Sequence, residues 1–447
     1  MAGIRRRSLI CVAALAPLIL AAPAEAKTFV VTKLGDPAPN GCGNGGCSLR
    51  EAVIAANARS GPDAIELPKA KTYRLAVANT APDGEDAALE GDLDVTGALR
   101  VAHLGKGRAK IDAREIDRVF DVFAPTRFSK VVITGGDVDD YGGGIRAEDD
   151  VQVLRSAVVR NHSTRDGGGI SFPDAGSSLL VTRSSISRNV SDDDGGGVGF
   201  DSSGGGVFKV TRSRFVGNRS DDWGGGFISA VTAKISNSTF AGNRAMGGTG
   251  GGGSLEEPDD NVVRNTTFSG NRADADGGGL DVSGGADARL VNVTIADNSA
   301  GDAGGGLKAT DGAVSMNAVS VVRNEATDGG GIAGSPADVV RVANSMIALN
   351  DATGTGPDCF ADGDDFRSRG HNLLSTAAGC DGFDKPSDLE RADPKVQQLA
   401  RNGGPTKTVA LKPGSPAIGE ANRRTAPKSD QRGRKRDRRP DIGAFER

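Results

Sequence analysis

Runs of aspartate lie just ahead of the glycine triplets that recur through the middle of the chain, and they have the strongest potential for chemistry. The longest run is Asp192, Asp193 and Asp194, and Asp221 and Asp222 stand ahead of the next triplet. If successive repeats stack as paired strands, such carboxylates lie about 5 Å apart. This separation suits a shared Ca²⁺ ion or the carboxylate pair of a retaining glycosidase. The first three are therefore candidate catalytic residues, and Asp193, Asp194, Asp221 and Asp222 are candidate metal ligands; the alternative is that all are solvated loop tips that discourage edge association.

Three arginines form a second pattern. Arg155, Arg183 and Arg212 each lie six residues before a recurring asparagine. Positive charges stacked at this spacing repel one another unless carboxylates or a polyanion lie across them. The pattern predicts either ion pairs with neighbouring aspartates or a weak binding site for an acidic glycan. Arg183 is also the candidate base of a lyase that would act with the run Asp192 to Asp194 and bound Ca²⁺.

Other catalytic signatures are absent from the sequence. The polygalacturonase pattern of N-T-D followed by G-H-G and R-I-K does not occur, and neither does the nucleophile motif G-x-S-x-G. The three histidines, His103, His162 and His371, stand isolated in the sequence. An enzyme is therefore the less favoured class.

A repeat of about 27 residues must position these side chains. Glycine triplets recur at intervals of 25 to 29 residues, and asparagines follow at a matching phase. The third and eighth residues before each asparagine are always apolar, and the fifth is always small or β-branched. The asparagines are Asn161, Asn189, Asn218, Asn243, Asn271, Asn298, Asn324 and Asn350.

These columns predict an all-β fold, a right-handed parallel β-helix built as a single-stranded solenoid. A strand alternates with period two, so apolar residues at both the eighth and third positions require a bend between them. Glycine, serine, threonine and valine dominate each repeat, which excludes a helical solenoid. The asparagines should form an internal ladder, in which each amide bonds to the coils above and below and avoids the cost of an isolated buried amide.

Composition further restricts the possible fold classes and partners. The chain has 447 residues, of which 66 are glycine and 4% are aromatic, too few large apolar residues for one compact core of this length. The formal net charge of −4 gives no reason to expect a nucleic-acid partner.

Residues 1–26 have the features of a secretory signal. Arg5, Arg6 and Arg7 precede an apolar run, and an A-x-A site ends at Ala26. No transmembrane span is expected once this segment is removed. In an exported chain the remaining four cysteines favour two local disulfides, Cys42–Cys47 and Cys359–Cys380.

Three segments resemble families of exported proteins. The repeats, with FxGN at residues 215–218, 240–243 and 268–271 beside GGGI or GGGL, are similar to the polymorphic outer membrane protein repeat, whose members are surface-exposed β-helices associated with adhesion. The run from Cys47 to Ala52 resembles the CSLREA domain. Residues 370–374, 403–406, 414–418, 430–433 and 441–446 are similar to the choice-of-anchor Q domain.

The CSLREA-like run also predicts its own local structure. Ser48 and Glu51 form an S-x-x-E capping box that opens a short amphipathic helix, and this helix could cover the open end of the coil stack.

These observations predict four regions: the signal at 1–26, a cap with the first coils at 27–135, repeats at 136–350, and an irregular C-terminal region at 351–447. The expected function is that of an extracellular or cell-surface, adhesin-like module that binds a glycan or cell-envelope polymer. The alternative is a polysaccharide lyase or glycoside hydrolase acting on an acidic polysaccharide. No cofactor is expected apart from Ca²⁺ at the acidic runs. The basic stretch at 432–439 could add weak adhesion to anionic polymer or lipid.

Overall fold

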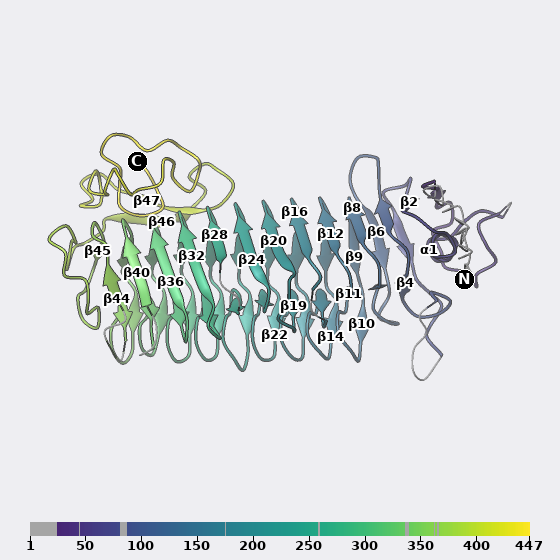
Figure 1. Cartoon of the computed structure of the whole chain (residues 1–447), viewed down its shortest axis with the longest axis horizontal. Helices are drawn as coiled ribbons and strands as arrows, with labels where there is room; N and C mark the ends of the chain where they lie inside the picture. The colour runs from purple at the N-terminus through teal and green to yellow at the C-terminus, as the bar shows by residue number, and fades with distance from the viewer. Residues whose placement is uncertain are drawn as a thin grey trace, which may run out of the picture.

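The computed structural model of the chain is an elongated parallel β-helix (Figure 1). It describes residues 25–447 except 44, 81–86, 175, 258–259, 336–338, 362 and 364–365, so nearly all of the expected signal segment lies outside the described residues. Four parallel sheets run along the solenoid, and each strand pairs with the equivalent strand of the next coil. The predicted fold class is therefore confirmed.

Sheets 1 and 2 form two adjacent sides of the solenoid. Sheet 1 consists of β1 (Thr28–Val30), β2 (Asp63–Glu66), β5 (Leu99–Ala102), β8 (Thr126–Ser129), β12 (Val151–Leu154), β16 (Leu179–Thr182), β20 (Val207–Thr211), β24 (Thr232–Ser236), β28 (Asn261–Arg264), β32 (Asp287–Val291), β36 (Ala313–Asn317), β40 (Val339–Ala343) and β44 (Phe366–Ser368). Sheet 2 consists of β3 (Thr72–Arg74), β6 (Ala109–Asp112), β9 (Val131–Thr134), β13 (Ala157–Val159), β17 (Ser185–Ser187), β21 (Arg214–Val216), β25 (Thr239–Ala241), β29 (Thr267–Ser269), β33 (Thr294–Ala296), β37 (Ser320–Val322), β41 (Met346–Ala348) and β45 (Leu373–Leu374).

Sheets 3 and 4 complete each coil before the chain returns to sheet 1. Sheet 3 consists of β10 (Asp137–Val138), β14 (His162–Ser163), β18 (Val190–Ser191), β22 (Arg219–Ser220), β26 (Arg244–Ala245), β30 (Arg272–Ala273), β34 (Ser299–Ala300), β38 (Glu325–Ala326) and β42 (Asp351–Ala352). Sheet 4 consists of β4 (Leu93–Val95), β7 (Phe120–Val122), β11 (Ile145–Ala147), β15 (Ile170–Phe172), β19 (Val198–Phe200), β23 (Phe227–Ser229), β27 (Ser254–Glu256), β31 (Leu280–Ser283), β35 (Leu307–Ala309), β39 (Ile332–Ala333) and β43 (Cys359–Phe360). The solenoid thus continues beyond residue 350, through β45.

Apolar columns fill the interior. The eighth and third residues before each ladder asparagine lie in sheets 1 and 2, and all of them are buried. The expected bend between them falls at residues such as Arg155, whose φ of +52° turns the next strand toward the core. The rings of Phe215, Phe240 and Phe268 stack on one another, with 4.8 Å between successive centroids. Like residues therefore pack on like along the axis, as predicted.

The asparagine ladder runs unbroken from Asn161 to Asn350. At Asn243, for example, the side-chain Nδ2 donates to Oδ1 of Asn271 at 3.0 Å and to the carbonyl oxygen of Phe215 at 3.2 Å. Its own Oδ1 accepts from the backbone and side-chain nitrogens of Asn218, both at 3.0 Å. Each side-chain amide is thus paired above and below within the buried interior. The ladder ends where Asn350 donates to the Asp358 carboxylate at 3.0 Å.

The glycine triplets allow the turn between sheets 3 and 4 to lie against the neighbouring coil. Gly167 has a φ of +73°, a conformation that favours glycine. A Cβ added at Gly168 would lie 2.1 Å from the carbonyl oxygen of Val190 in the next coil. The triplets are therefore required by close backbone approach.

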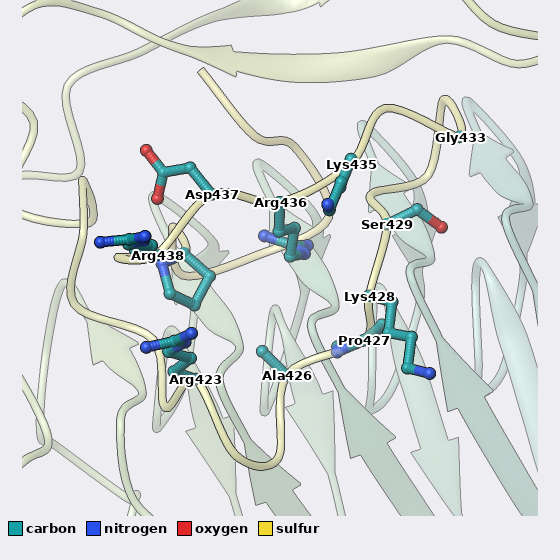
Figure 2. A pocket seen from close by; sticks show the side chains of 11 residues that line it. Arg423, Ala426, Pro427, Lys428, Ser429, Gly433, Lys435, Arg436, Asp437 and Arg438 are labelled. Atoms are coloured by element: carbon teal, nitrogen blue, oxygen red, sulfur yellow. The ribbon is translucent and has the colours of Figure 1, made fainter.

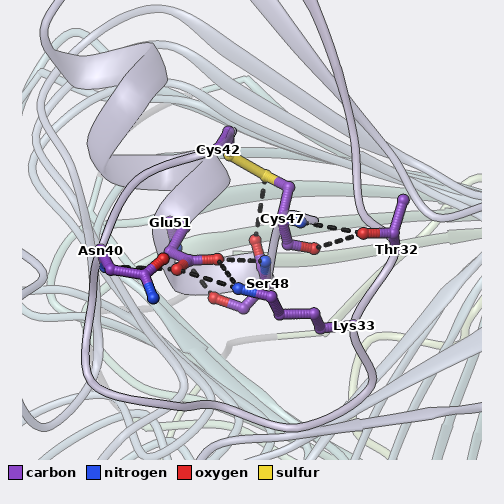
Figure 3. Close-up of a disulfide and its surroundings, with 7 residues drawn as sticks. All are labelled: Thr32, Lys33, Asn40, Cys42, Cys47, Ser48 and Glu51. Carbon is purple, nitrogen blue, oxygen red and sulfur yellow. Dashed lines mark hydrogen bonds and ion pairs between the residues drawn. A yellow bond between two sulfur atoms is a disulfide. The ribbon is translucent and has the colours of Figure 1, made fainter. Parts of the chain in front are cut away.

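The helix α1 (Leu49–Asn57) lies at the N-terminal end of the solenoid and contacts β1, β2 and β4 (Figure 1). Its predicted capping box is present, since the Ser48 hydroxyl accepts from the Glu51 amide and the Glu51 carboxylate accepts from the Ser48 amide. Figure 3 shows this cap beside the Cys42–Cys47 disulfide, with Lys33 bonded to Glu51. Both predicted disulfides form, the second joining Cys359 and Cys380.

Arg50 of α1 is completely buried and explains the arginine of the CSLREA-like run. Its guanidinium bonds both carboxylate oxygens of Asp36, with Nη2 3.0 Å from Oδ2. The remaining donors reach the carbonyl oxygens of residues 88, 90, 91 and 92 at 2.7 to 3.1 Å. The side chain thus fastens the helix to two otherwise irregular segments.

Beyond β45 the C-terminal region is irregular apart from an antiparallel pair, β46 (Val396–Ala400) and β47 (Thr408–Leu411). It packs along the outer side of sheet 2 at the downstream coils (Figure 1). Thr294 donates to Gln431 at 2.6 Å, and the Ala444 amide donates to Ser320 at 3.0 Å. Among the described residues, no helix has the length and apolar character that a membrane crossing needs.

Candidate functional site

One register position on the outer side of sheet 1 collects positive charge. Because strand residues alternate between the two sides of a sheet, one residue of each strand occupies the centre of the solvent-facing side. From β5 to β44, in-register pairing aligns these residues into what we term the central column, which consists of Arg100, Arg127, Gln152, Leu180, Lys209, Lys234, Val262, Arg289, Ser315, Arg341 and Arg367. Seven of its eleven positions are arginine or lysine.

The cations of the central column are free to meet a ligand. Six of the seven are exposed, and Arg341 is half-buried. None of them forms an ion pair with a residue that the structure describes. Ten coil steps of about 4.8 Å separate Arg100 from Arg367, so the column extends over about 48 Å. The result is a row of positive charges along the axis, interrupted at the four uncharged positions Gln152, Leu180, Val262 and Ser315.

The arginines predicted as a glycan strip border this track. Arg155, Arg183 and Arg212 occupy the bend between sheets 1 and 2 in three successive coils, with φ values of 51° to 52°. All three are exposed, and none has a carboxylate partner among the described residues. The predicted stacking is therefore present, whereas the alternative of pairing with nearby aspartates is not observed. We call these three arginines and the cations of the central column the basic face.

Sequence reasoning missed the central column although a signal exists. From β12 to β40 its members lie nine residues before the ladder asparagines, as Lys209 does before Asn218 and Arg289 before Asn298. The columns recognised in the sequence are positions eight, five and three, which define the core, together with position six. The residue nine positions before the asparagine is next to the buried residue at position eight on the same strand, so its side chain is expected on the outer side of the sheet.

Carboxylates gather on a different edge, at the turn between sheets 3 and 4. Asp166, Asp193 and Asp194 each bring a carboxylate oxygen within 4.8 Å of the others, and we call them the acidic group. The Asp194 amide donates to Asp166 at 3.2 Å, and the Trp223 amide donates to Asp194 at 2.6 Å. All three ligands are oxygen atoms, the donors that Ca²⁺ prefers.

The carboxyl groups of Asp166 and Asp194 have raised pKa values. Burial raises the pKa of Asp166 to about 7, and the neighbouring Asp194 carboxylate adds to the rise. Burial also raises the pKa of Asp194 to about 6, with a further contribution from the charges of Asp193 and Asp222. Near neutral pH the carboxyl groups of Asp166 and Asp194 are therefore either partly protonated or stabilised by a nearby positive charge.

The carboxylates that could hold a metal ion differ in part from those expected. Asp193 and Asp194 are among them, but the third is Asp166 on the preceding coil, which was not among the expected ligands. Asp221 forms an ion pair with Arg219 at 2.5 Å. Asp222 lies near enough to Asp193 that burial and this charge raise its pKa.

The proposed catalytic set is not brought together. Arg183 stands at the bend between sheets 1 and 2, whereas Asp192, Asp193 and Asp194 follow sheet 3, so two sheets lie between them along the coil. Asp192 instead accepts from His162, which also contacts Asp137 at 2.6 Å. His162 stands alone in the sequence, but in the structure it contacts two carboxylates. The arrangement gives no support to Arg183 as the base of a lyase at this edge.

A second carboxylate cluster is already neutralised. Asp92, Asp94 and Asp121 lie close enough to hold an ion. However, Arg118 pairs with Asp121 at 2.7 Å and with Asp92 at 3.4 Å, and Arg146 pairs with Asp121 at 2.9 Å. These arginines make the cluster a buried ionic network rather than a metal site.

Comparisons with known proteins give a likeness of fold. No family model matches the chain, and no curated protein matches it. Among solved structures, the crystal structure of pectate lyase Pel9A matches with a TM-score of 0.49 and 15% sequence identity, covering 95% of this chain and 97% of that one. No residue role is carried over from a match at this level.

Proposed function

We propose that the protein binds an acidic polysaccharide along the basic face of sheet 1. The observation that carries the proposal is the central column, seven cations held in register and unpaired among the described residues. A linear polymer with regularly spaced carboxylates can follow such a track and contact several cations at once. Each exposed contact contributes little, about 0.2–1 kcal/mol, but linked contacts add because later ones form within one complex.

A polysaccharide fits this face better than a nucleic acid. Proteins that bind single strands combine positive charge with aromatic side chains on which bases stack, and no residue of the central column is aromatic. The net charge of −4 means that the rest of the molecule carries a net negative charge, which opposes a bulky polyanion that wraps the molecule. A single narrow polymer along one side avoids this repulsion.

The affinity of polygalacturonate tests the proposal. Replacing Arg127, Lys209, Lys234 and Arg289 with alanine should weaken binding at least roughly 30-fold, since four contacts of about 0.5 kcal/mol each are lost. Binding of the parent chain should also decline with added salt. Titration of the labelled polymer followed by fluorescence anisotropy measures both effects.

A matched control removes four exposed cations from other positions, namely Arg188, Arg219, Arg244 and Arg272. Arg219 and Arg272 are paired with Asp221 and Asp274, which reduces their pull on a polymer. The control should keep the parent affinity within about 3-fold. Equal losses in both variants, or a preference for single-stranded DNA over polygalacturonate, would refute a glycan track on sheet 1.

The same incubations distinguish binding from turnover. A polysaccharide lyase or glycoside hydrolase at Asp192, Asp193 and Asp194 is the alternative function, supported by the raised pKa of Asp194. Release of reducing ends or of unsaturated products, lost on Asp193→Ala, would favour the enzyme. Binding without products would favour the binding module.

We further propose that the chain is exported and acts at the cell surface as an adhesin-like module. Two disulfides support an oxidising compartment. The signal-like residues 1–26 and the resemblance to CSLREA and choice-of-anchor Q domains point in the same direction.

We also propose Ca²⁺ as the counter-charge of the acidic group, and pH tests this. Because the pKa values of Asp166 and Asp194 are higher in the folded chain than in the unfolded one, the folded state binds more protons between pH 4 and 7. Without the ion, the free energy of unfolding should therefore fall as pH rises through this window. Millimolar Ca²⁺ at pH 8 should restore the loss and raise the Tm.

Two asparagine variants give the comparison. Asp166→Asn should flatten the decline with pH and reduce the effect of Ca²⁺, whereas Asp287→Asn, at an exposed position of sheet 1, should behave as the parent does. Thermal melts at pH 5 and pH 8, with Ca²⁺ and with chelator, measure these differences. A Tm that Ca²⁺ leaves unchanged at pH 8 would exclude the metal.

A further inference from the structure

A basic pocket lies within the C-terminal region, away from the central column. Two arms of one loop enclose it, residues 423–429 on one side and 433–440 on the other, and a bridge between Ser429 and Lys435 joins them. Its volume is about 860 Å³. Figure 2 shows Arg423 and Arg438 near one end of the pocket and Lys428 and Lys435 toward the other.

The loop is held in place by the solenoid beneath it. Asn292, at the bend between sheets 1 and 2, donates to the Ser429 carbonyl oxygen at 2.9 Å. Arg436 is buried at the base of the second arm, where it donates to Glu446 at 3.0 Å and to Asn292 at 3.3 Å. The Nε atom of Arg436 is buried and has no partner among the described residues. The pocket is thus a partly open depression, and one of its lining residues, Arg436, has a buried donor without a described partner.

The charges that line the pocket are not balanced. Arg423, Lys428, Lys435 and Arg438 are exposed, and none of them forms an ion pair with a described residue. Arg436 is already paired with Glu446, and Asp437 is the one acidic lining residue. Four unpaired cations against one carboxylate leave a net charge of about +3. A ligand with several negative charges is needed to offset it.

We propose that this pocket binds a ligand carrying two or more phosphate groups. A planar carboxylate can be satisfied by one arginine from one side. Here the cations approach from two facing arms, an arrangement that suits a tetrahedral phosphate, whose oxygens point in several directions and which carries a charge of up to −2. This site goes beyond the glycan track on sheet 1 and shares none of its residues.

Tripolyphosphate is the probe, and citrate is the matched carboxylate. In low salt we expect saturable binding of one tripolyphosphate per chain by isothermal titration calorimetry, and at least 10-fold weaker binding of citrate. The double variant Lys435→Ala with Arg438→Ala should lose at least 10-fold in tripolyphosphate affinity. A double variant of two exposed arginines outside the pocket, Arg424→Ala with Arg434→Ala, removes equal charge and should lose less than 3-fold.

The source of the phosphate is distinguished with vesicles. Co-sedimentation with vesicles containing 20% phosphatidate, lost in the pocket variant and displaced by tripolyphosphate, would identify a lipid headgroup. Binding of tripolyphosphate without co-sedimentation would identify a soluble or polymer-borne phosphate. Absence of saturable binding to either, equal binding of citrate, or equal losses in both double variants would overturn the proposal. None of these results depends on polygalacturonate binding, so the two proposals fail separately.

Discussion

An Arg50→Ala variant should lose about 3–5 kcal/mol of unfolding free energy, because it removes one partner of a fully buried ion pair. The change leaves the Asp36 carboxylate without its guanidinium and takes the donors from the carbonyl oxygens of residues 88, 90, 91 and 92. Urea unfolding followed by circular dichroism measures the loss. Limited proteolysis should also show cleavage near residues 88–92 before the repeats are attacked.

Two companion variants separate charge from geometry. Arg50→Lys keeps the charge but lacks the planar fork, so it should recover only part of the lost stability. Arg59→Ala also removes an arginine from the end of the same helix, yet its ion pair with Asp63 is partly exposed and should be worth less than about 1 kcal/mol. If Arg50→Ala were no more destabilising than Arg59→Ala, the fastening role of Arg50 would be wrong.

An Asn243→Ala variant should lose about 2–5 kcal/mol in the middle of the solenoid. The change leaves the Asn218 side chain and amide without their acceptor, and it leaves the Phe215 carbonyl and the Asn271 amide oxygen short of a donor. Each buried polar group without a partner costs about 1–3 kcal/mol. Denaturant unfolding measures the loss.

The matched control is Asn237→Gly in a neighbouring turn. Asn237 lies at the bend between sheets 1 and 2 with a φ of +52°, which glycine adopts freely, and it is not a ladder residue. This variant should stay within about 1 kcal/mol of the parent. A loss at Asn243 that is no larger than the loss at Asn237 would mean that the ladder does not contribute to stability.

The core of the fold was predictable because it repeats. The columns that contain Phe240 and Asn243 recur at one phase, and a residue type that recurs inside a solenoid meets its own kind in the next coil. The capping box at Ser48 was predictable for another reason, since its bonds span only three residues. Contacts can be predicted directly from the sequence in two cases, when the partners are a few residues apart and when the same residue type recurs in every coil.

The candidate sites were predicted less well, because their members recur irregularly. Asp166 and Asp194 both directly precede a glycine triplet, but Trp223 takes this position in the following coil. The column of aspartates is therefore interrupted, and Asp166 was not expected beside Asp194. The central column mixes cations with Gln152, Leu180, Val262 and Ser315, which hides its charge from a search for identical residues.

The C-terminal region could not be placed from sequence at all. Its contacts join residues more than 100 positions apart, such as Thr294 with Gln431 and Ser320 with Ala444. No periodic pattern links these residues, since only one partner of each pair belongs to a repeat. The basic pocket depends on this docking and was therefore visible in sequence only as a charged stretch.

The unbroken ladder gives the molecule an adjustable length. Because every inner amide has the same partners above and below, a whole coil of about 27 residues can be duplicated or deleted between two ladder asparagines without leaving an unmatched end. Each such event would lengthen or shorten the track on sheet 1 by about 4.8 Å. Duplication or loss of a coil can therefore change the length of the basic face, while both ends of the solenoid stay as they are.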